Sequence, residues 1–221
     1  MKKIKITSIY VLLIVSFCYK SVGQIHNQEK NLKESDKFVQ KMESKASWTD
    51  LKIPDAEIAV IKKAINSYKP ILDNNKKLNL TTENLNGSGI SIWFNGENKS
   101  DKKVAAGTIA KELGLDLYRI DLSLVVSKYI GETEKNLDKI FDAAEGKNWI
   151  LFFDEADALF GKRTQVDDAH DKYANQEVSY LLQRIELYQG LVILATNSKT
   201  QIDESKLRRF KYIVHFPVPK K

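Results

Sequence analysis

The sequence contains little cysteine, histidine and proline, and no long apolar run. Among its 221 residues are one cysteine, three histidines and four prolines. One cysteine cannot form a disulfide within the chain, and histidines this far apart give no zinc-binding pattern. The longest apolar segment, Ile6 to Cys18, is shorter than the roughly 20 residues that a helix needs to span a bilayer. These absences exclude a disulfide scaffold and a histidine-based zinc site.

A basic leader precedes that apolar segment, and small residues follow it at Ser21-Val22-Gly23. This order is typical of a secretory signal peptide, so we expect residues 1–23 to direct export to the periplasm or the medium. The alternative is an uncleaved leader that anchors the chain in the membrane. Cleavage takes the formal net charge from +6 to +2, since the leader holds no acid and four lysines: Lys2, Lys3, Lys5 and Lys20. The remaining charges alternate in sign, so no nucleic-acid surface is expected.

Residues 24–46 are polar with few apolar side chains, and we interpret them as a linker. From Pro54 to Pro70 apolar residues recur at helical spacing, which predicts an amphipathic helix followed by a polar loop. Short apolar runs then alternate with helical stretches, which predicts an α/β fold. We expect a five-stranded parallel sheet, with strands at 90–94, 117–122, 149–154, 191–196 and 212–216. Helices at 104–113, 132–144 and 173–188 cover both faces.

The most specific feature is an apolar strand that ends in two adjacent acids, Asp154 and Glu155. The carboxyl ends of strands in open α/β sheets are where ligands bind. One carboxylate at such a place can hold Mg²⁺, and the next can polarise an attacking water. The structural alternative is that both acids cap the helix that follows. One strand later, Asn197 stands at a corresponding position.

These residues resemble the AAA-type ATPases, which are P-loop NTPases. Residues 152–156 resemble the Walker B motif and Asn197 the first sensor. Arg208 and Arg209 resemble arginine fingers, and Lys128-Tyr129-Ile130-Gly131 resembles the first pore loop. The resemblance implies that Asp154 binds Mg²⁺ through water, that Glu155 activates the hydrolytic water and that Asn197 positions it. It also implies that Arg208 and Arg209 reach a neighbouring subunit's site and that Tyr129 grips a polypeptide.

The phosphate-binding loop departs from this family pattern. A phosphate loop reads Gly-x-x-x-x-Gly-Lys-Ser/Thr, and the chain has Gly96-Glu97-Asn98-Lys99-Ser100-Asp101-Lys102-Lys103 there. Gly96 and Lys102 remain as expected phosphate ligands. Asp101 replaces the second glycine and Lys103 replaces the hydroxyl residue. We therefore expect Asp101 or Ser100 to cap the helix and fill part of the phosphate site.

Taken together, residues 47–221 are interpreted as an AAA-type core without the helical lid, because only two lysines follow Pro219. The resemblance implies ATP and Mg²⁺ as ligands. It also implies a protein or peptide partner and assembly with like or related subunits. The altered loop favours a pseudo-ATPase that acts through protein interactions. The alternative is a weakly active ATPase that remodels proteins, with Lys102, Asp154 and Glu155 still in use.

Overall fold

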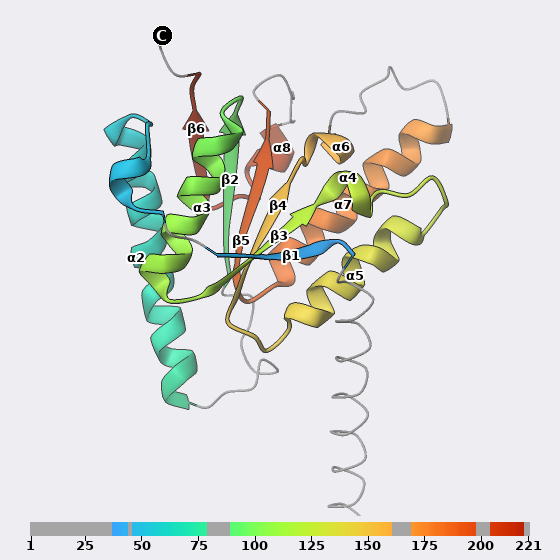
Figure 1. The fold of residues 1–221 in the computed structure, drawn as a ribbon. Helices are drawn as coiled ribbons and strands as arrows, with labels where there is room; N and C mark the ends of the chain where they lie inside the picture. Colours follow the sequence, from blue (N-terminus) through green and yellow to red (C-terminus); the bar gives the residue numbers. More distant parts are fainter. Residues whose placement is uncertain (1–36, 44–45, 79–88, 161–168, 198–203, 219–221) are drawn as a thin grey trace, which may run out of the picture.

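The computed structural model describes residues 37–43, 46–78, 89–160, 169–197 and 204–218 (Figure 1). The expected leader, and most of the expected linker, lie outside these ranges. No helix within them is long and apolar enough to cross a membrane.

A six-stranded sheet forms the centre of the molecule, in the order β1-β3-β4-β5-β2-β6. The ladders from β3 to β6 are all parallel, whereas β1 pairs with β3 in the antiparallel direction. Continuous apolar runs predict β4 and β5 well, because both strands are buried along their whole length. The strands are β1 (Val39–Met42), β2 (Ile90–Gly96), β3 (Asp116–Asp121), β4 (Trp149–Asp154), β5 (Leu191–Thr196) and β6 (Tyr212–Phe216).

The α/β class with a mostly parallel sheet is confirmed, but the expected number of five strands is wrong. The additional strand is β1, which lies within the segment interpreted as a linker and pairs along the outer edge of β3 (Figure 1). Its four residues, Val-Gln-Lys-Met, give no apolar pattern. Phe38, just before the strand, is only 7% exposed and joins the core beside Ile120. Buried Phe38, together with the partly buried Val39 and Met42, therefore anchors a strand whose two central residues are polar and exposed.

Helices cover both faces of the sheet and divide the core into two layers (Figure 1). Ile61, Ile65 and Ile109 belong to the cluster between the sheet and helices α2 and α3, and Leu137 and Leu181 belong to the cluster under α5 and α7. The helical elements are η1 (Trp48–Asp50), α2 (Asp55–Leu78), α3 (Lys99–Leu113), α4 (Leu122–Val125), α5 (Glu132–Ala144), α6 (Asp157–Phe160), α7 (Ala169–Leu187) and α8 (Glu204–Leu207).

Two helix boundaries differ from the sequence prediction. Helix α2 continues through Pro70 to Leu78, although the apolar pattern placed its end near the proline. Proline removes one backbone donor and usually kinks a helix, yet buried Tyr68 and Leu72 on either side of Pro70 hold this one against the sheet. Helix α3 begins at Lys99 and not at Val104. The expected phosphate loop therefore runs directly into the first turn of α3.

Candidate functional site

The carboxyl ends of β2, β4 and β5 lie at one edge of the sheet, because these strands are parallel and adjacent. In sheets of this kind, that edge is where ligands bind. Four of the expected site residues lie at or just after these strand ends: Gly96, Asp154, Glu155 and Asn197. The first turn of α3 brings charged side chains to the same place.

Asp154 is the last residue of β4 and is 4% exposed. Its Oδ1 accepts a hydrogen bond of 3.0 Å from the backbone N–H of Glu155. Its Oδ2 accepts a hydrogen bond of 2.8 Å from Arg119 Nε and lies 3.7 Å from Lys103 Nζ. Two cationic side chains of the chain itself thus stand at one oxygen of the carboxylate that was expected to bind Mg²⁺.

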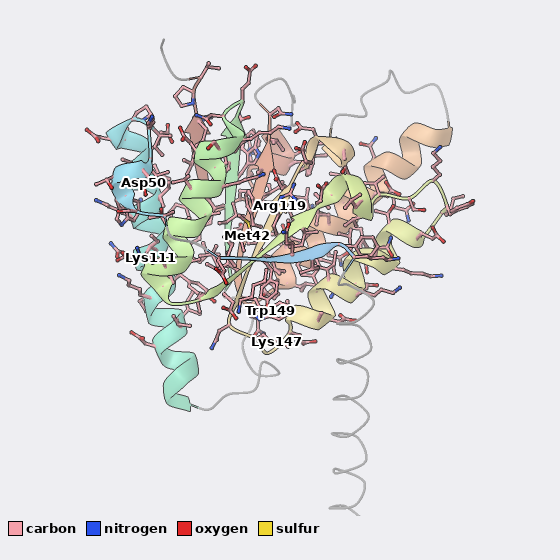
Figure 2. The ribbon with its side chains drawn as sticks, viewed as in Figure 1. Met42, Asp50, Lys111, Arg119, Lys147 and Trp149 are labelled. Carbon is pink, nitrogen blue, oxygen red and sulfur yellow. The ribbon has the colours of Figure 1, made fainter. Side chains whose placement is uncertain are left out.

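Arg119 projects from β3 and is labelled in Figure 2. Besides its bond to Asp154, it donates from Nη2 to Asp121 Oδ2 over 3.1 Å. Burial lowers the pKa of the guanidinium, but the hydrogen bond and negative charge of Asp154 outweigh that effect and the net pKa is raised. Arg119 therefore joins the acids that end two neighbouring strands. Sequence analysis missed this residue, because it stands inside a strand pattern without any motif.

Glu155 has a backbone φ of 55°, which side-chain-bearing residues rarely adopt. The bend lets the next residue, Ala156, donate its N–H to the carbonyl of Ala195 at the end of β5, over 3.0 Å. The Glu155 carboxylate contacts Lys99, with 2.6 Å between Oε1 and Nζ. The hydrogen bond to Glu155 is the main reason that the pKa of Lys99 is raised. The carboxylate expected to activate water is thus paired with an ammonium group.

The loop before α3 starts at Gly96, which has a φ of 143° and lies against β6. A Cβ at this position would lie 2.0 Å from the carbonyl oxygen of Phe216, so only glycine fits. The N-cap of α3 is Asn98, whose Oδ1 accepts from the N–H of Asp101 over 3.1 Å. Asp101 Oδ2 in turn accepts from Asn98 Nδ2 over 2.6 Å. The internal cap exists, but Asn98 forms it, so the expectation that Asp101 or Ser100 is the cap is wrong.

Lys102 is 3% exposed, and its ammonium group points back onto the backbone. Nζ donates to the carbonyl oxygens of Gly96 over 2.7 Å and of Thr196 over 2.9 Å. Burial lowers the pKa of Lys102, and the negative charges of Asp154 and Asp157 oppose that shift. The lysine thereby links the last residues of β2 and β5 to α3.

Asn197, the expected sensor, follows β5 and is half-buried. Its backbone N–H donates to both oxygens of Asp157, over 3.1 Å to Oδ1 and 3.0 Å to Oδ2. Burial raises the pKa of Asp157, and the hydrogen bond from Asn197 opposes it. Asp157 thus fixes Asn197 next to the acids of β4. Sequence analysis assigned Asp157 no role, although its place three residues after Asp154 was a usable signal.

The remaining expected residues lie on other elements. Arg208 and Arg209 follow α8 and are exposed, and Arg209 Nη1 lies 3.5 Å from Glu186 Oε2 on α7. Tyr129 lies in the connection between α4 and α5 and is 73% exposed, next to Ile130 at 77%. Arg209 therefore has an ion-pair partner within the chain, and Tyr129 presents an aromatic ring to solvent.

The chemistry of the donor set fits Mg²⁺ poorly. Magnesium prefers oxygen ligands in an octahedral arrangement, and the position that supplies a hydroxyl in a phosphate loop holds the ammonium group of Lys103. Within the described ranges, no group of three or more His, Cys, Asp or Glu side chains is arranged to hold a metal ion. ATP fits no better at the second glycine position, where Asp101 is 6% exposed and its carboxylate is hydrogen-bonded to Asn98.

Comparison with known proteins gives matches over most of this core. The model of the family described as "ATPase family associated with various cellular activities (AAA)" matches residues 92–218. An uncharacterized AAA family ATPase of Sinorhizobium fredii is 30% identical over 184 residues, which cover 82% of this chain and 53% of that protein.

Two archaeal proteins match a shorter part of the chain. Cell division protein C of Sulfolobus acidocaldarius is 35% identical over 53% of this chain and 34% of that protein. The proteasome-activating nucleotidase of Aeropyrum pernix is 32% identical over 58% of this chain and 33% of that protein. The chain therefore spans about half, or less, of the length of these relatives.

Proposed function

The chain belongs to the AAA family of ATPases, and from this premise we propose that it is a pseudo-ATPase, a member that acts through protein contacts without turning over ATP. The matched residues 92–218 include the whole site described above. Membership of the family implies ATP and Mg²⁺ as ligands, but the side chains at the site fit neither ligand well.

The observation that carries the proposal is the ion pair between Lys99 and Glu155, at 2.6 Å. By family resemblance Glu155 is the base that activates water, and a base acts only if the water can reach it. An ammonium group on the carboxylate takes the place of that water.

The loop residues support the same proposal. Phosphate binding at a helix N-terminus uses free backbone N–H groups and the helix dipole. Here Asn98 accepts from the N–H of Asp101, and the carboxylate of Asp101 stands beside it. A negative charge in the first turn of α3 opposes a second anion there. Removing one oxyanion donor costs on the order of 3 kcal/mol in enzymes, and here the N–H of Asp101 is already occupied.

Exposed apolar side chains support a protein partner. Tyr129 and Ile130 are 73% and 77% exposed, and nearby Leu124 is 59% exposed. Aromatic and aliphatic groups in contact with water on one connection are typical of an interaction site. By family resemblance Tyr129 would contact a polypeptide, and we include binding of a protein or peptide, with or without assembly with other AAA subunits, in the proposal.

A weakly active ATPase is the second candidate. Asp154 and Glu155 end β4 as the family chemistry needs, and Asp157 holds Asn197 beside them. The Lys99 side chain is 52% exposed and that of Glu155 31%, so this ion pair is partly screened by water. A nucleotide that bound strongly enough would separate it.

Calorimetric titration of the purified full chain with Mg-ATP separates the two candidates, together with phosphate release by the chain and by Glu155→Gln. A pseudo-ATPase shows no saturable heat at several millimolar nucleotide, and its phosphate release equals that of the variant. If Mg-ATP binds saturably and the chain releases phosphate faster than Glu155→Gln does, the protein is a weak ATPase instead. Lys135→Gln, at an exposed position of α5, is the control for handling and purity.

We also propose export, on the basis of the leader at residues 1–23. Fractionation of cells that express the full chain tests it. A shorter chain outside the cytoplasmic membrane supports cleavage, a full-length chain in the membrane fraction supports an anchor, and a full-length chain in the cytoplasm contradicts both.

A further inference from the structure

Two lysines on one face of α3 contact two consecutive acids at the end of β4. Lys99 and Lys103 are four residues apart, so they lie one helical turn from each other on the same side of the helix. Lys99 Nζ is 2.6 Å from Glu155 Oε1, and Lys103 Nζ is 3.7 Å from Asp154 Oδ2. We call this set of four residues the lysine clamp.

The clamp occupies the space between the loop and the strand end. Asp154 is nearly buried, with 6% of its side chain exposed, whereas the Lys103 side chain is 41% exposed. The ammonium group therefore enters the site from solvent and ends at the buried carboxylate. Arg119 contacts the same carboxylate from β3, so that two cations share Asp154 Oδ2.

The charges explain why this arrangement is stable without a ligand. Two carboxylates side by side at a strand end repel each other. A cation that lies next to them, on the side of the loop, offsets that repulsion. In a metal-dependent site the cation is Mg²⁺, held between the loop hydroxyl and the acid. Here Lys103 stands at the hydroxyl position, and its own charge meets the acid directly.

We propose that the lysine clamp is a built-in replacement for the metal, which locks the first turn of α3 onto β4 and keeps the site in one conformation whether or not Mg²⁺ and nucleotide are present. This inference deepens the proposed function. It rests on that function in one respect, namely that the protein works without nucleotide. A protein-binding surface next to this site would then keep one conformation, and nucleotide would not change it.

Hydrogen exchange tests the lock directly. In the full chain, Lys99→Gln with Lys103→Gln removes both charges and keeps the length of the side chains nearly unchanged. We expect exchange in residues 99–103 and 154–156 to speed up by roughly three- to tenfold, in line with the loss of two partly exposed ion pairs. Lys111→Gln, on the same helix but beyond the site, should leave both segments as in the unchanged chain. Equal exchange in all three proteins overturns the proposal.

A second measurement tests the replacement of the metal. Asp101→Gly alone restores the loop glycine and keeps both lysines, whereas Asp101→Gly with Lys99→Gly and Lys103→Thr also removes the clamp. We expect Mg-ATP to raise the midpoint of thermal unfolding of the triple variant by several degrees and to leave that of the single variant unchanged. If Mg-ATP shifts the unfolding midpoint of both variants equally, or of neither variant, the proposal is contradicted.

The phosphate-release assay and the exchange measurement together separate this inference from the proposed function. Turnover of ATP by the unchanged chain refutes the pseudo-ATPase, even if the exchange result shows a lock. An unchanged chain without turnover, combined with equal exchange in the variants, refutes the clamp and leaves the pseudo-ATPase in place.

Discussion

Arg119 donates from Nε to Asp154 Oδ2 over 2.8 Å, and this contact joins β3 to the last residue of β4. The same guanidinium reaches Asp121, so that one cation neutralises acids at two strand ends. Both acids lie close to the site, and the charge of Arg119 therefore decides how strongly they repel each other.

Replacement of Arg119 by methionine should destabilise the fold by about 2–4 kcal/mol, because it leaves the nearly buried Asp154 with the longer 3.7 Å contact to Lys103 in place of the 2.8 Å bond from Arg119. Denaturant unfolding followed by circular dichroism measures the loss. Lys41→Met removes an exposed ion pair with Asp116 and should have a much smaller effect, because water screens exposed charges. Equal costs for the two variants would show that Arg119 behaves as a surface cation.

Gly96→Ala should be severely destabilising, by about 3 kcal/mol or more, since its Cβ would lie 2.0 Å from the carbonyl oxygen of Phe216 at a φ of 143°. Gly114→Ala is the matched control. Gly114 also has a positive φ, 64°, but a Cβ there has nothing within 4 Å, so we expect a cost of about 1 kcal/mol. The comparison of the two unfolding curves separates steric contact from backbone preference.

Tyr68→Phe should change the stability of the protein in alkali. Burial raises the pKa of Tyr68 from 10.0 to about 12, so the folded chain keeps this proton where the unfolded chain loses it. Stability therefore falls as the pH rises through that interval, by up to about 1.4 kcal/mol per pH unit from this group. The variant should show a correspondingly shallower fall when unfolding is measured between pH 10 and 12.

The control for this pH series is Tyr129→Phe, because the Tyr129 side chain is 73% exposed. Its curve should follow that of the unchanged chain. If Tyr68→Phe also follows it, the Tyr68 hydroxyl is reached by water in the folded state.

Phe38→Ala tests whether β1 is part of the folded core. Phe38 is 7% exposed and packs with Ile120, so the truncation should cost about 2–4 kcal/mol. Amide exchange in the β1 segment should become faster at the same time, because the strand has only one neighbour to hold it. A variant as stable as the unchanged chain would contradict the assignment of β1 to the sheet.

The sequence predicted the five strands that hold a short run of apolar, β-branched or aromatic residues, and missed β1, which has no such run. Residues 149–154 and 191–196 are buried on both faces, which favours the continuous apolar runs that precede their last residues. Strand β1 lies at an edge, where one side faces water and polar residues are tolerated, so it has no recognisable pattern. Its position depends on Phe38, whose role appears only when the sheet is complete.

At the site, the positions of Asp154, Glu155 and Asn197 were predictable, because they follow from where strands end. The contacts of these residues were not. The pairing of Lys99 with Glu155 depends on how α3 is rotated against β4, and sequence spacing does not determine that rotation. The cap at Asn98 depends on the first helical residue, which local patterns place only to within a few positions. Arg119 was hidden because strand positions facing a helix are expected to be apolar.

The hydrogen bonds of Lys102 affect how degenerate members of such families can be recognised. Because its ammonium group holds the carbonyls of Gly96 and Thr196, this lysine has a structural role in the loop that does not depend on phosphate. Its presence in a genome sequence is thus ambiguous as a marker of enzymatic activity. The neighbouring residue is more informative: a hydroxyl at position 103 would serve a metal, whereas the lysine found there meets an acid of its own chain.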